Sequence, residues 1–325
     1  MVSAVSLSII YWWLFVRPIC SFTDFRTKFF IDIPQEQIFA YGGSTSWIPI
    51  VSPVGSAIKA LPEFDLRYIT PLPSGGSGWG IGELLQGRLA FSLSSRLPTD
   101  EERQKVLAQG FALDSVAVGI DAIVVAVNPN LNIPGLTIAQ LRDIYTGKIS
   151  NWNQVGGPNL PITPYSRRLE ESDTVQYFFV NVLENISFNP QVVQFIDNTT
   201  VGVQQVIKNP GGIYFGSASA IVPQCSIRSL PLGLEPGNFI APYKGFYKGL
   251  PQCLRERNEI NLDAIEKGDY PLTRILFVII KNFPDDNNPE EKAGRAYANL
   301  MLTGEGQAIV EKAGFAPISR ACPSR

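Results

Sequence analysis

The segment Val116-Ala-Val-Gly-Ile-Asp-Ala-Ile-Val-Val-Ala-Val127 decides the fold class. Its apolar, mostly β-branched residues favour a strand that is buried on both faces of a mixed or parallel sheet. A second run of the same kind spans Arg274 to Ile280. Shorter strand patterns alternate with helix patterns around both runs, as is typical of α/β layers. The sequence therefore predicts an α/β protein with mixed sheets and helices on both faces.

The two long strands also divide the chain. A length of 325 residues fits two domains better than one. Strands this far apart in sequence are expected where the chain crosses between two lobes. We therefore expect lobe I to contain residues 31–117 and 273–325, and lobe II to contain residues 118–272. A cleft between two lobes is a common ligand site.

Composition narrows the function. The formal charge of −2 gives no basic excess, so we expect no nucleic-acid partner. The chain has no histidine, which removes Ser-His-Asp and Cys-His catalysis and every zinc site that uses histidine. The four cysteines form no Cys-x-x-Cys pair, which argues against a metal cluster. We expect a protein that is not an enzyme and that needs no cofactor and no metal.

The N-terminal segment is apolar from Val2 to Val16, and Arg17 follows it. It is shorter than the roughly 20 residues of a membrane span and has the length of a signal-peptide core. However, no basic residue precedes it and no small-x-small cleavage site follows. Residues 1–30 are therefore interpreted as a signal or membrane-anchor segment with a tether, in which residues 2–16 would anchor the protein in the membrane. A buried N-terminal element is the alternative.

Cys225 and Cys253 flank a stretch that is rich in proline. If the chain is exported, a disulfide between them would hold this stretch together. Two reduced thiols in a cytosolic loop are the alternative.

Three loops place Gly, Ser and Thr just ahead of a helix pattern. They are Tyr41-Gly-Gly-Ser-Thr-Ser-Trp47, Pro73-Ser-Gly-Gly-Ser-Gly-Trp-Gly80, and Tyr165-Ser-Arg-Arg-Leu-Glu-Glu-Ser-Asp-Thr174. Free backbone N–H groups and the positive end of a helix dipole favour an anion at such places, and hydroxyl side chains add donors. Three such loops suggest a cleft that holds a small oxyanion without covalent chemistry.

Two long stretches and the C-terminal end resemble a known family. The stretches are Gly119-Ile-Asp-Ala-Ile-Val-Val-Ala-Val-Asn-Pro129 and Leu141-Arg-Asp-Ile-Tyr-Thr-Gly-Lys-Ile-Ser-Asn-Trp152; Leu136-Thr137, Tyr270–Arg274, Gly304–Gln307 and Ala313–Ile318 match as well. Over roughly residues 36–320 the chain resembles the PstS-like phosphate-binding proteins of ABC transporters, within the type II periplasmic binding proteins. The resemblance implies a two-lobed fold with the ligand in the cleft between the lobes.

The same resemblance implies a set of ligand residues from four loops. Carried over by position, they are Ser44, Thr45, Ser46 and Trp47; Ser77 and Gly78; Ser95 and Arg96; and Arg168, Ser172, Asp173 and Thr174. Two positions depart from the family. Some members have an acidic acceptor where this chain has Ser95, and the usual Gly of the fourth loop is Asp173.

Several of these residues have a second interpretation. Arg168 suits bidentate pairing with an oxyanion, or it pairs at the surface with Glu170 or Glu171; its neighbour Arg167 is expected at the surface. Ser172 is a ligand residue, an ordinary N-cap, or both. For Ser46 and Ser77 the alternative is a flexible turn. Asp173 either accepts the proton of hydrogen phosphate or is an exposed residue that complements the helix dipole. Trp47 either walls the cleft or packs in the core.

The resemblance implies capture of inorganic phosphate by a periplasmic, monomeric solute-binding protein that delivers it to an ABC permease. Without cleavage of the N-terminal segment, the protein would be anchored to the inner membrane. The alternatives are the same fold with another oxyanion, such as sulfate, molybdate or an organophosphate, and an anchored phosphate sensor without transport. A hydrolase that uses Ser or carboxylates is a further alternative, which the lack of histidine disfavours.

Overall fold

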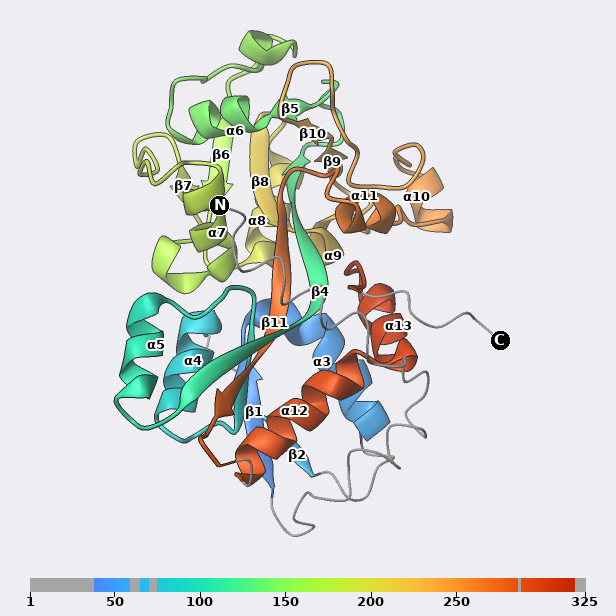
Figure 1. The fold of residues 1–325 in the computed structure, drawn as a ribbon. Helices are drawn as coiled ribbons and strands as arrows, with labels where there is room; N and C mark the ends of the chain where they lie inside the picture. Colours follow the sequence, from blue (N-terminus) through green and yellow to red (C-terminus); the bar gives the residue numbers. More distant parts are fainter. Residues whose placement is uncertain (1–37, 59–64, 70–74, 286–287, 319–325) are drawn as a thin grey trace, which may run out of the picture.

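The computed structural model describes residues 38–58, 65–69, 75–285 and 288–318. Two α/β lobes lie end to end and are joined by two long strands that run through both (Figure 1). The predicted signal or anchor segment, residues 1–30, lies outside the described residues. Within the described ranges, no helix has both the length and the apolar character needed to cross a membrane.

The joining strands are β4 (Ala112–Val127) and β11 (Thr273–Asn282). They pair antiparallel from Thr273 opposite Ala122 to Asn282 opposite Ala112, with one shift of register between Leu276 and Phe277. They form the centre of a sheet with the order β2-β1-β3-β11-β4-β8-β6-β7, in which β9 also pairs with β4. These are the two apolar runs that the sequence marks as buried strands.

The lower lobe in Figure 1 contains the first and the last described elements. Strands β1 and β2 are parallel, as are β1 and β3, while β3 runs antiparallel to β11. The aromatic rings of Tyr41 and Phe91 stack with centroids 5.1 Å apart, and that of Tyr297 lies 4.9 Å from Phe91. The elements are β1 (Phe39–Gly43), η1 (Thr45–Trp47), α3 (Ile48–Ile58), β2 (Leu66–Tyr68), α4 (Ser77–Leu85), β3 (Phe91–Ser94), α5 (Asp100–Leu107), α12 (Pro289–Met301) and α13 (Gly304–Lys312).

The upper lobe contains the middle of the chain. Its core includes Phe178 and Phe215, whose rings stack at 3.8 Å, and the buried Tyr145 and Trp152. The elements are β5 (Leu136–Thr137), α6 (Ile138–Tyr145), η2 (Trp152–Val155), β6 (Thr163–Ser166), η3 (Leu169–Glu171), α7 (Asp173–Asn181), β7 (Gln194–Phe195), α8 (Thr199–Lys208), β8 (Gly212–Ser217), α9 (Ala218–Ile221), β9 (Arg228–Leu230), β10 (Leu232–Gly233), α10 (Gln252–Arg255) and α11 (Leu262–Glu266).

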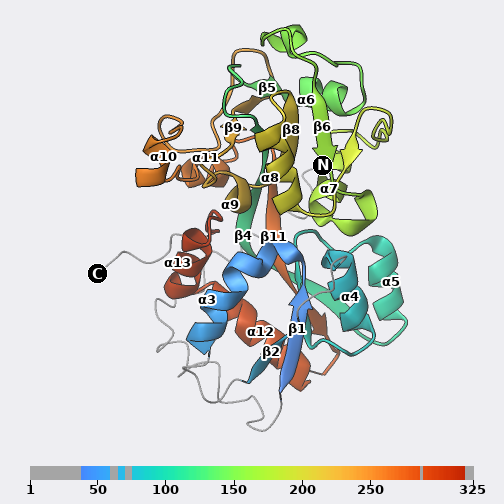
Figure 2. The same ribbon diagram turned by 180° about the vertical axis from the view of Figure 1, so that it is seen from behind.

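Each lobe has its own hydrophobic core. On β4, Val118 belongs to the core of the lower lobe and Ala122 to that of the upper lobe. On the return path, Leu272 lies in the upper core and Leu276 in the lower one. Figure 2 shows from behind that α4 and α5 of the lower lobe lie below α7 and α8 of the upper lobe. The predicted two-lobed α/β fold with mixed pairing is confirmed.

Local signals in the sequence set several helix starts. Thr99 and Thr137 each form a capping box, with Glu102 and Gln140 as the reciprocal partners. Two other helices, α4 and α7, begin at Ser77 and Asp173, inside the loops that were expected to precede a helix pattern. Their first turns face each other across the lobes.

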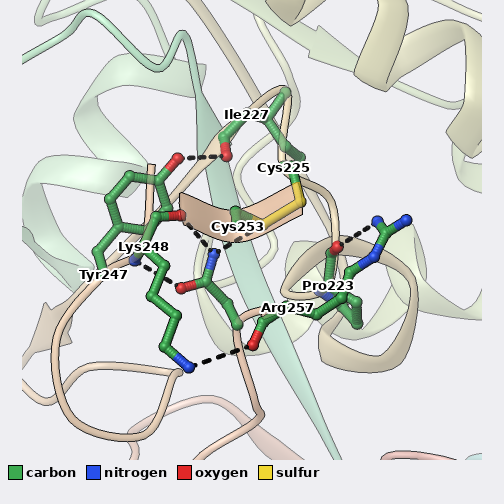
Figure 3. The surroundings of a disulfide bond; sticks show 8 residues. Pro223, Cys225, Ile227, Tyr247, Lys248, Cys253 and Arg257 are labelled. Atoms are coloured by element: carbon green, nitrogen blue, oxygen red, sulfur yellow. Dashed lines mark hydrogen bonds between the residues drawn. A yellow bond between two sulfur atoms is a disulfide. The ribbon is translucent and has the colours of Figure 1, made fainter. Parts of the chain in front are cut away.

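Cys225 and Cys253 are joined by a disulfide (Figure 3). It links the segment before β9 to α10, a part of the upper lobe with little regular structure. Tyr247 Oη donates to the Ile227 carbonyl at 2.8 Å, and Arg257 Nη1 donates to the Pro223 carbonyl at 2.9 Å. The bond and these contacts hold a long irregular segment against the lobe.

Candidate functional site

Three serine hydroxyls meet at one edge of the lower sheet. Ser44 follows β1, Ser95 follows β3, and Ser77 opens α4. Because β1 and β3 are parallel neighbours, their carboxyl ends lie at the same edge, which is where α/β sheets bind ligands. The hydroxyl oxygens of Ser44 and Ser95 are 3.1 Å apart, those of Ser77 and Ser95 are 3.4 Å apart, and the Ser95 amide donates to Ser77 Oγ at 2.9 Å. The cluster is buried, since none of these residues is more than 4% exposed.

Glycines bring the helix close to the strand end. Gly43 has a φ of +140°, and a Cβ there would lie 2.0 Å from the Leu93 carbonyl oxygen. A Cβ on Gly80 would lie 2.5 Å from the Cα of Gly43. Neither position accepts a side chain without displacing backbone. The first turn of α4 is therefore held directly against the loop after β1.

Asp173, at the start of α7 in the upper lobe, reaches across to this cluster. Its Oδ2 accepts hydrogen bonds from the Ser77 amide at 2.6 Å, from Ser77 Oγ at 2.9 Å and from Ser95 Oγ at 3.4 Å. The N-cap of α4 is Gly76, which has no side chain to accept from the first turn. Asp173 therefore caps α4 from the other lobe, and the donors of the cluster are occupied by an oxyanion of the chain itself.

Arg274 makes a second contact between the lobes. It lies on β11 opposite Asp121 on β4, and its Nε and Nη2 donate to Asp121 Oδ2 at 3.0 and 2.9 Å. The same Nη2 lies 2.7 Å from Ser46 Oγ in the lower lobe and 3.0 Å from Thr174 Oγ1 in the upper lobe. Ser217 Oγ donates to the other carboxylate oxygen, Asp121 Oδ1, at 2.6 Å. Arg274 Nη1 is buried and has no hydrogen-bond partner among the described residues.

Arg96 lies beside the serine cluster and forms a salt bridge with Glu102. Its Nη1 and Nη2 donate to the two carboxylate oxygens at 2.8 Å each. Burial raises the pKa of Glu102, but the hydrogen bonds from Arg96 and Thr99 outweigh burial and leave this pKa below its ordinary value of 4.5. The hydrogen bond to Glu102 raises the pKa of Arg96 further, and the nearby Asp173 carboxylate adds to this effect. A fixed positive charge thus stands next to the bound carboxylate.

A cavity of about 200 Å³ lies between the lobes next to Asp173. Its walls come from the loop after β1, from the start of α7 and from the end of β8, and they contain both polar and apolar side chains. This volume exceeds that of a small tetrahedral anion. The lining residues relevant to an anion are Thr45, Ser46, Arg167, Ser172, Asp173, Thr174, Ser217 and Ser219.

The structure does not bring all the predicted residues together. Trp47 is fully buried in the lower core, where its indole N–H donates to the Ser94 carbonyl at 3.0 Å and its backbone amide donates to Ser44. Arg168 is exposed, with its guanidinium 5.4 Å from the centre of the Phe195 ring. Gly78 lies one residue into α4 on the exposed side. Arg96 is paired with Glu102 beside the serine cluster, and the other predicted ligand residues lie in that cluster, in the Arg274 contacts or along the cavity.

Arg167, which we expected at the surface, lines the cavity in place of Arg168. The chain remains extended after β6, so neighbouring side chains point to opposite sides. Arg167 Nη2 donates to the Glu171 carbonyl at 2.6 Å, while its buried Nε has no hydrogen-bond partner in the described part of the chain. Sequence position favoured Arg168 for the ligand side, whereas in the structure it is Arg167 that lines the cavity.

Asp121 and Arg274 form a buried ion pair in contact with the predicted site residues Ser46 and Thr174, and sequence reasoning treated Arg274 and Asp121 only as parts of the scaffold. A signal for them was present. Each is a charged residue in one of the two long apolar strand runs, where an unpaired charge would be costly. Charges of opposite sign in two buried strands indicate an ion pair.

The chain was compared with known proteins. The family model for the PBP superfamily domain matches residues 34–305. The phosphate-binding protein PstS of Borreliella burgdorferi is 28% identical over 290 residues, covering 86% of this chain and 90% of that protein. The PstS of Staphylococcus epidermidis is 27% identical over 244 residues, covering 74% and 67%.

Solved structures share the fold. One is a protein of Clostridium perfringens, provisionally named a phosphate ABC transporter substrate-binding protein and solved with bound phosphate. It superimposes with a TM-score of 0.65 at 23% identity over 87% of this chain and 100% of its own. An ABC-type phosphate transport receptor of Vibrio cholerae gives 0.63 at 21% identity over 86% and 99%. With the family model matched over most of its length and the same fold in these structures, the chain belongs to the PBP superfamily.

Proposed function

We propose that this protein captures inorganic phosphate and delivers it to an ABC transporter. The observation that carries the proposal is the convergence of the Ser77 amide, Ser77 Oγ and Ser95 Oγ on one carboxylate oxygen, Asp173 Oδ2, with Ser44 Oγ behind them in contact with Ser95 Oγ. A buried set of neutral donors at a helix N-terminus suits an oxyanion, and such a site needs no metal and no covalent step. The similarity to PstS proteins over most of the chain supports phosphate as that oxyanion.

The proposal includes how the two lobes act. Lobe I, residues 31–117 and 273–325, contributes the loops at 44–47, 77–78 and 95–96. Lobe II, residues 118–272, contributes the loop from Arg168 to Thr174. Closure of one lobe on the other surrounds the anion, as expected for a hinged binding protein. Arg274 holds Ser46 and Thr174 in place at the hinge.

The setting of the protein follows from the same reasoning. We propose a monomer outside the cytoplasm that passes phosphate to the permease subunits of the transporter and carries out no catalysis. The Cys225–Cys253 disulfide supports an oxidising compartment. Residues 2–16 serve as a signal or as a tether to the inner membrane.

Calorimetry tests the ligand. Residues 30–325, freed of bound anion by dialysis, are titrated with phosphate, sulfate, molybdate and a phosphate monoester. Binding of phosphate in preference to sulfate is the expected result. If the protein prefers another anion, that anion and not phosphate is the ligand. Hydrolysis of the phosphate monoester would contradict a role in binding alone. If the protein binds phosphate but no permease gene lies next to its own gene, a phosphate sensor without transport is favoured.

A further inference from the structure

The site proposed for phosphate is already filled by the chain. Asp173 Oδ2 accepts from both donors of Ser77, and Ser95 Oγ lies within reach of the same oxygen. A hydroxyl has one proton to donate and a backbone amide has one N–H. The protons that Asp173 receives are therefore not available to a free anion while this contact persists.

The place that Asp173 occupies is fitted to its carboxylate. A Cβ on Gly76 would lie 2.7 Å from Asp173 Oδ1, so the absence of a side chain there makes room for the carboxyl group. The group also lies at the N-terminus of α4, a helix of nine residues, and near the Arg96 guanidinium. Donors, space and charge all favour an acidic group at this point.

The contact also joins the lobes. Ser77 and Gly76 belong to the lower lobe, whereas Asp173 begins α7 of the upper lobe. With Asp173 in place, the two helix N-termini are held face to face. A second set of hydrogen bonds, from Arg274 to Ser46 and Thr174, lies next to this contact and also holds the two lobes together.

We propose that Asp173 is a tethered competitor of the ligand: its carboxylate occupies the anion site, holds the empty protein closed, and must leave before an anion enters. This inference rests on the proposed function, because it concerns regulation of the same site. It places Asp173 as a determinant of affinity rather than as an acceptor for the proton of the bound ligand. When the binding-competent form is a small fraction of the molecules, the apparent dissociation constant rises by the inverse of that fraction.

The first test needs no ligand. Small-angle scattering in phosphate-free buffer compares the wild type with Asp173→Ala, which removes the competitor, and with Gly76→Ala, which takes up its space from the other lobe. Both variants are expected to show a larger radius of gyration than the wild type. Asp197→Ala, at an exposed aspartate of the upper lobe, is the matched control and is expected to scatter like the wild type. Near-ultraviolet circular dichroism verifies that each variant is folded.

The second test measures competition. Titration with inorganic phosphate is expected to give a dissociation constant at least about tenfold lower for Asp173→Ala than for the wild type and Asp197→Ala. The inference is overturned if Asp173→Ala and Gly76→Ala both scatter like the wild type. It is also overturned if Asp173→Ala and the wild type bind phosphate with the same affinity. Opening of the variants without any phosphate binding supports the competitor while it refutes phosphate as the ligand. If all variants bind phosphate equally tightly and their scattering is unchanged, phosphate is supported as the ligand and the competitor role of Asp173 is refuted.

Discussion

Arg274 and Asp121 form an ion pair that is withdrawn from water, with side chains 2% and 0% exposed. A buried pair gains little over a well-packed apolar pair, but a single charge left in such a place is costly. The Asp121 carboxylate is further held by Ser217, and Arg274 connects it to both lobes. These charges lie opposite each other on β11 and β4, the two strands that join the lobes.

Asp121→Asn tests this pair. The substitution keeps the shape of the side chain but leaves the buried Arg274 without its counter-ion, so we expect a loss of about 3–5 kcal/mol in the free energy of unfolding. Urea unfolding followed by tryptophan fluorescence measures it. Glu101→Gln, which removes an exposed ion pair to Lys105 on α5, is the control and is expected to have little effect. Similar small losses for both variants contradict the role given to Asp121.

Glu102→Gln tests the charge on Glu102. Glutamine also serves in a capping box, so the substitution removes the charge and keeps the cap at Thr99. Because the pKa of Glu102 is lowered in the folded state, its contribution to stability is present above the ordinary value of 4.5 and is lost as the pH falls through the folded value. The wild type should therefore be more stable than the variant at pH 7, and the difference should shrink below about pH 4.5. Denaturation midpoints of both proteins between pH 3 and pH 7 measure the effect; a difference that does not vary with pH contradicts it.

At the scale of elements, the sequence predicted what local chemistry determines. Thr99 and Thr137 were recognisable as helix starts because each cap is completed within four residues. Helix α4 begins inside the loop that was expected to precede it, and the sequence could not show this because the group that caps its first turn is Asp173, 96 residues from Ser77. The same limit applies to Arg167 and Arg168, since only the direction of the extended chain after β6 decides which of them faces the cavity. The resemblance to the PstS-like family pointed to the four loops, but it could not show that Asp173 of the fourth loop lies against Ser77 of the second.

The irregular segment of the upper lobe depends on its disulfide. Cys225 and Cys253 are separated by 28 residues, and a loop of this length restricts the unfolded chain by about 3–4 kcal/mol. The double variant Cys225→Ser/Cys253→Ser should lose about that much stability in urea unfolding. A reducing agent should lower the midpoint of the wild type and leave that of the variant unchanged. Equal midpoints for the oxidised wild type and the variant would show that the bond adds nothing.

At the scale of the molecule, two cores share one pair of strands. The core changes from one lobe to the other between Val118 and Ala122 on β4, and again between Leu272, just before β11, and Leu276 on β11. This arrangement was predictable, because two long apolar runs far apart in sequence have few other ways to be buried together. A ligand bound between the lobes should therefore stabilise both at once.

Phosphate at about 100 times its dissociation constant is expected to raise the free energy of unfolding by about 2.7 kcal/mol. Calorimetric scans with phosphate and with sulfate at equal concentration measure the effect. One cooperative transition that moves upward with phosphate is expected. If only one of two transitions moves, the ligand binds within a single lobe rather than between the two.

The hydrogen-bonded pairing of β4 with β11 continues where the two strands pass from one lobe to the other. Its register shift, between Leu276 and Phe277, lies close to the point where the hydrophobic core of the lower lobe begins. Such a local irregularity increases strand twist, so we expect rotation of the lobes about it to leave most of the backbone pairing intact. The equilibrium between the separated and the apposed arrangement then depends mainly on side-chain hydrogen bonds, each worth about 1.5–3 kcal/mol where a charged group takes part. Since about 1.4 kcal/mol corresponds to a factor of ten in a population, the removal of a single hydroxyl such as that of Ser77 is expected to shift the ratio of the two arrangements by about tenfold.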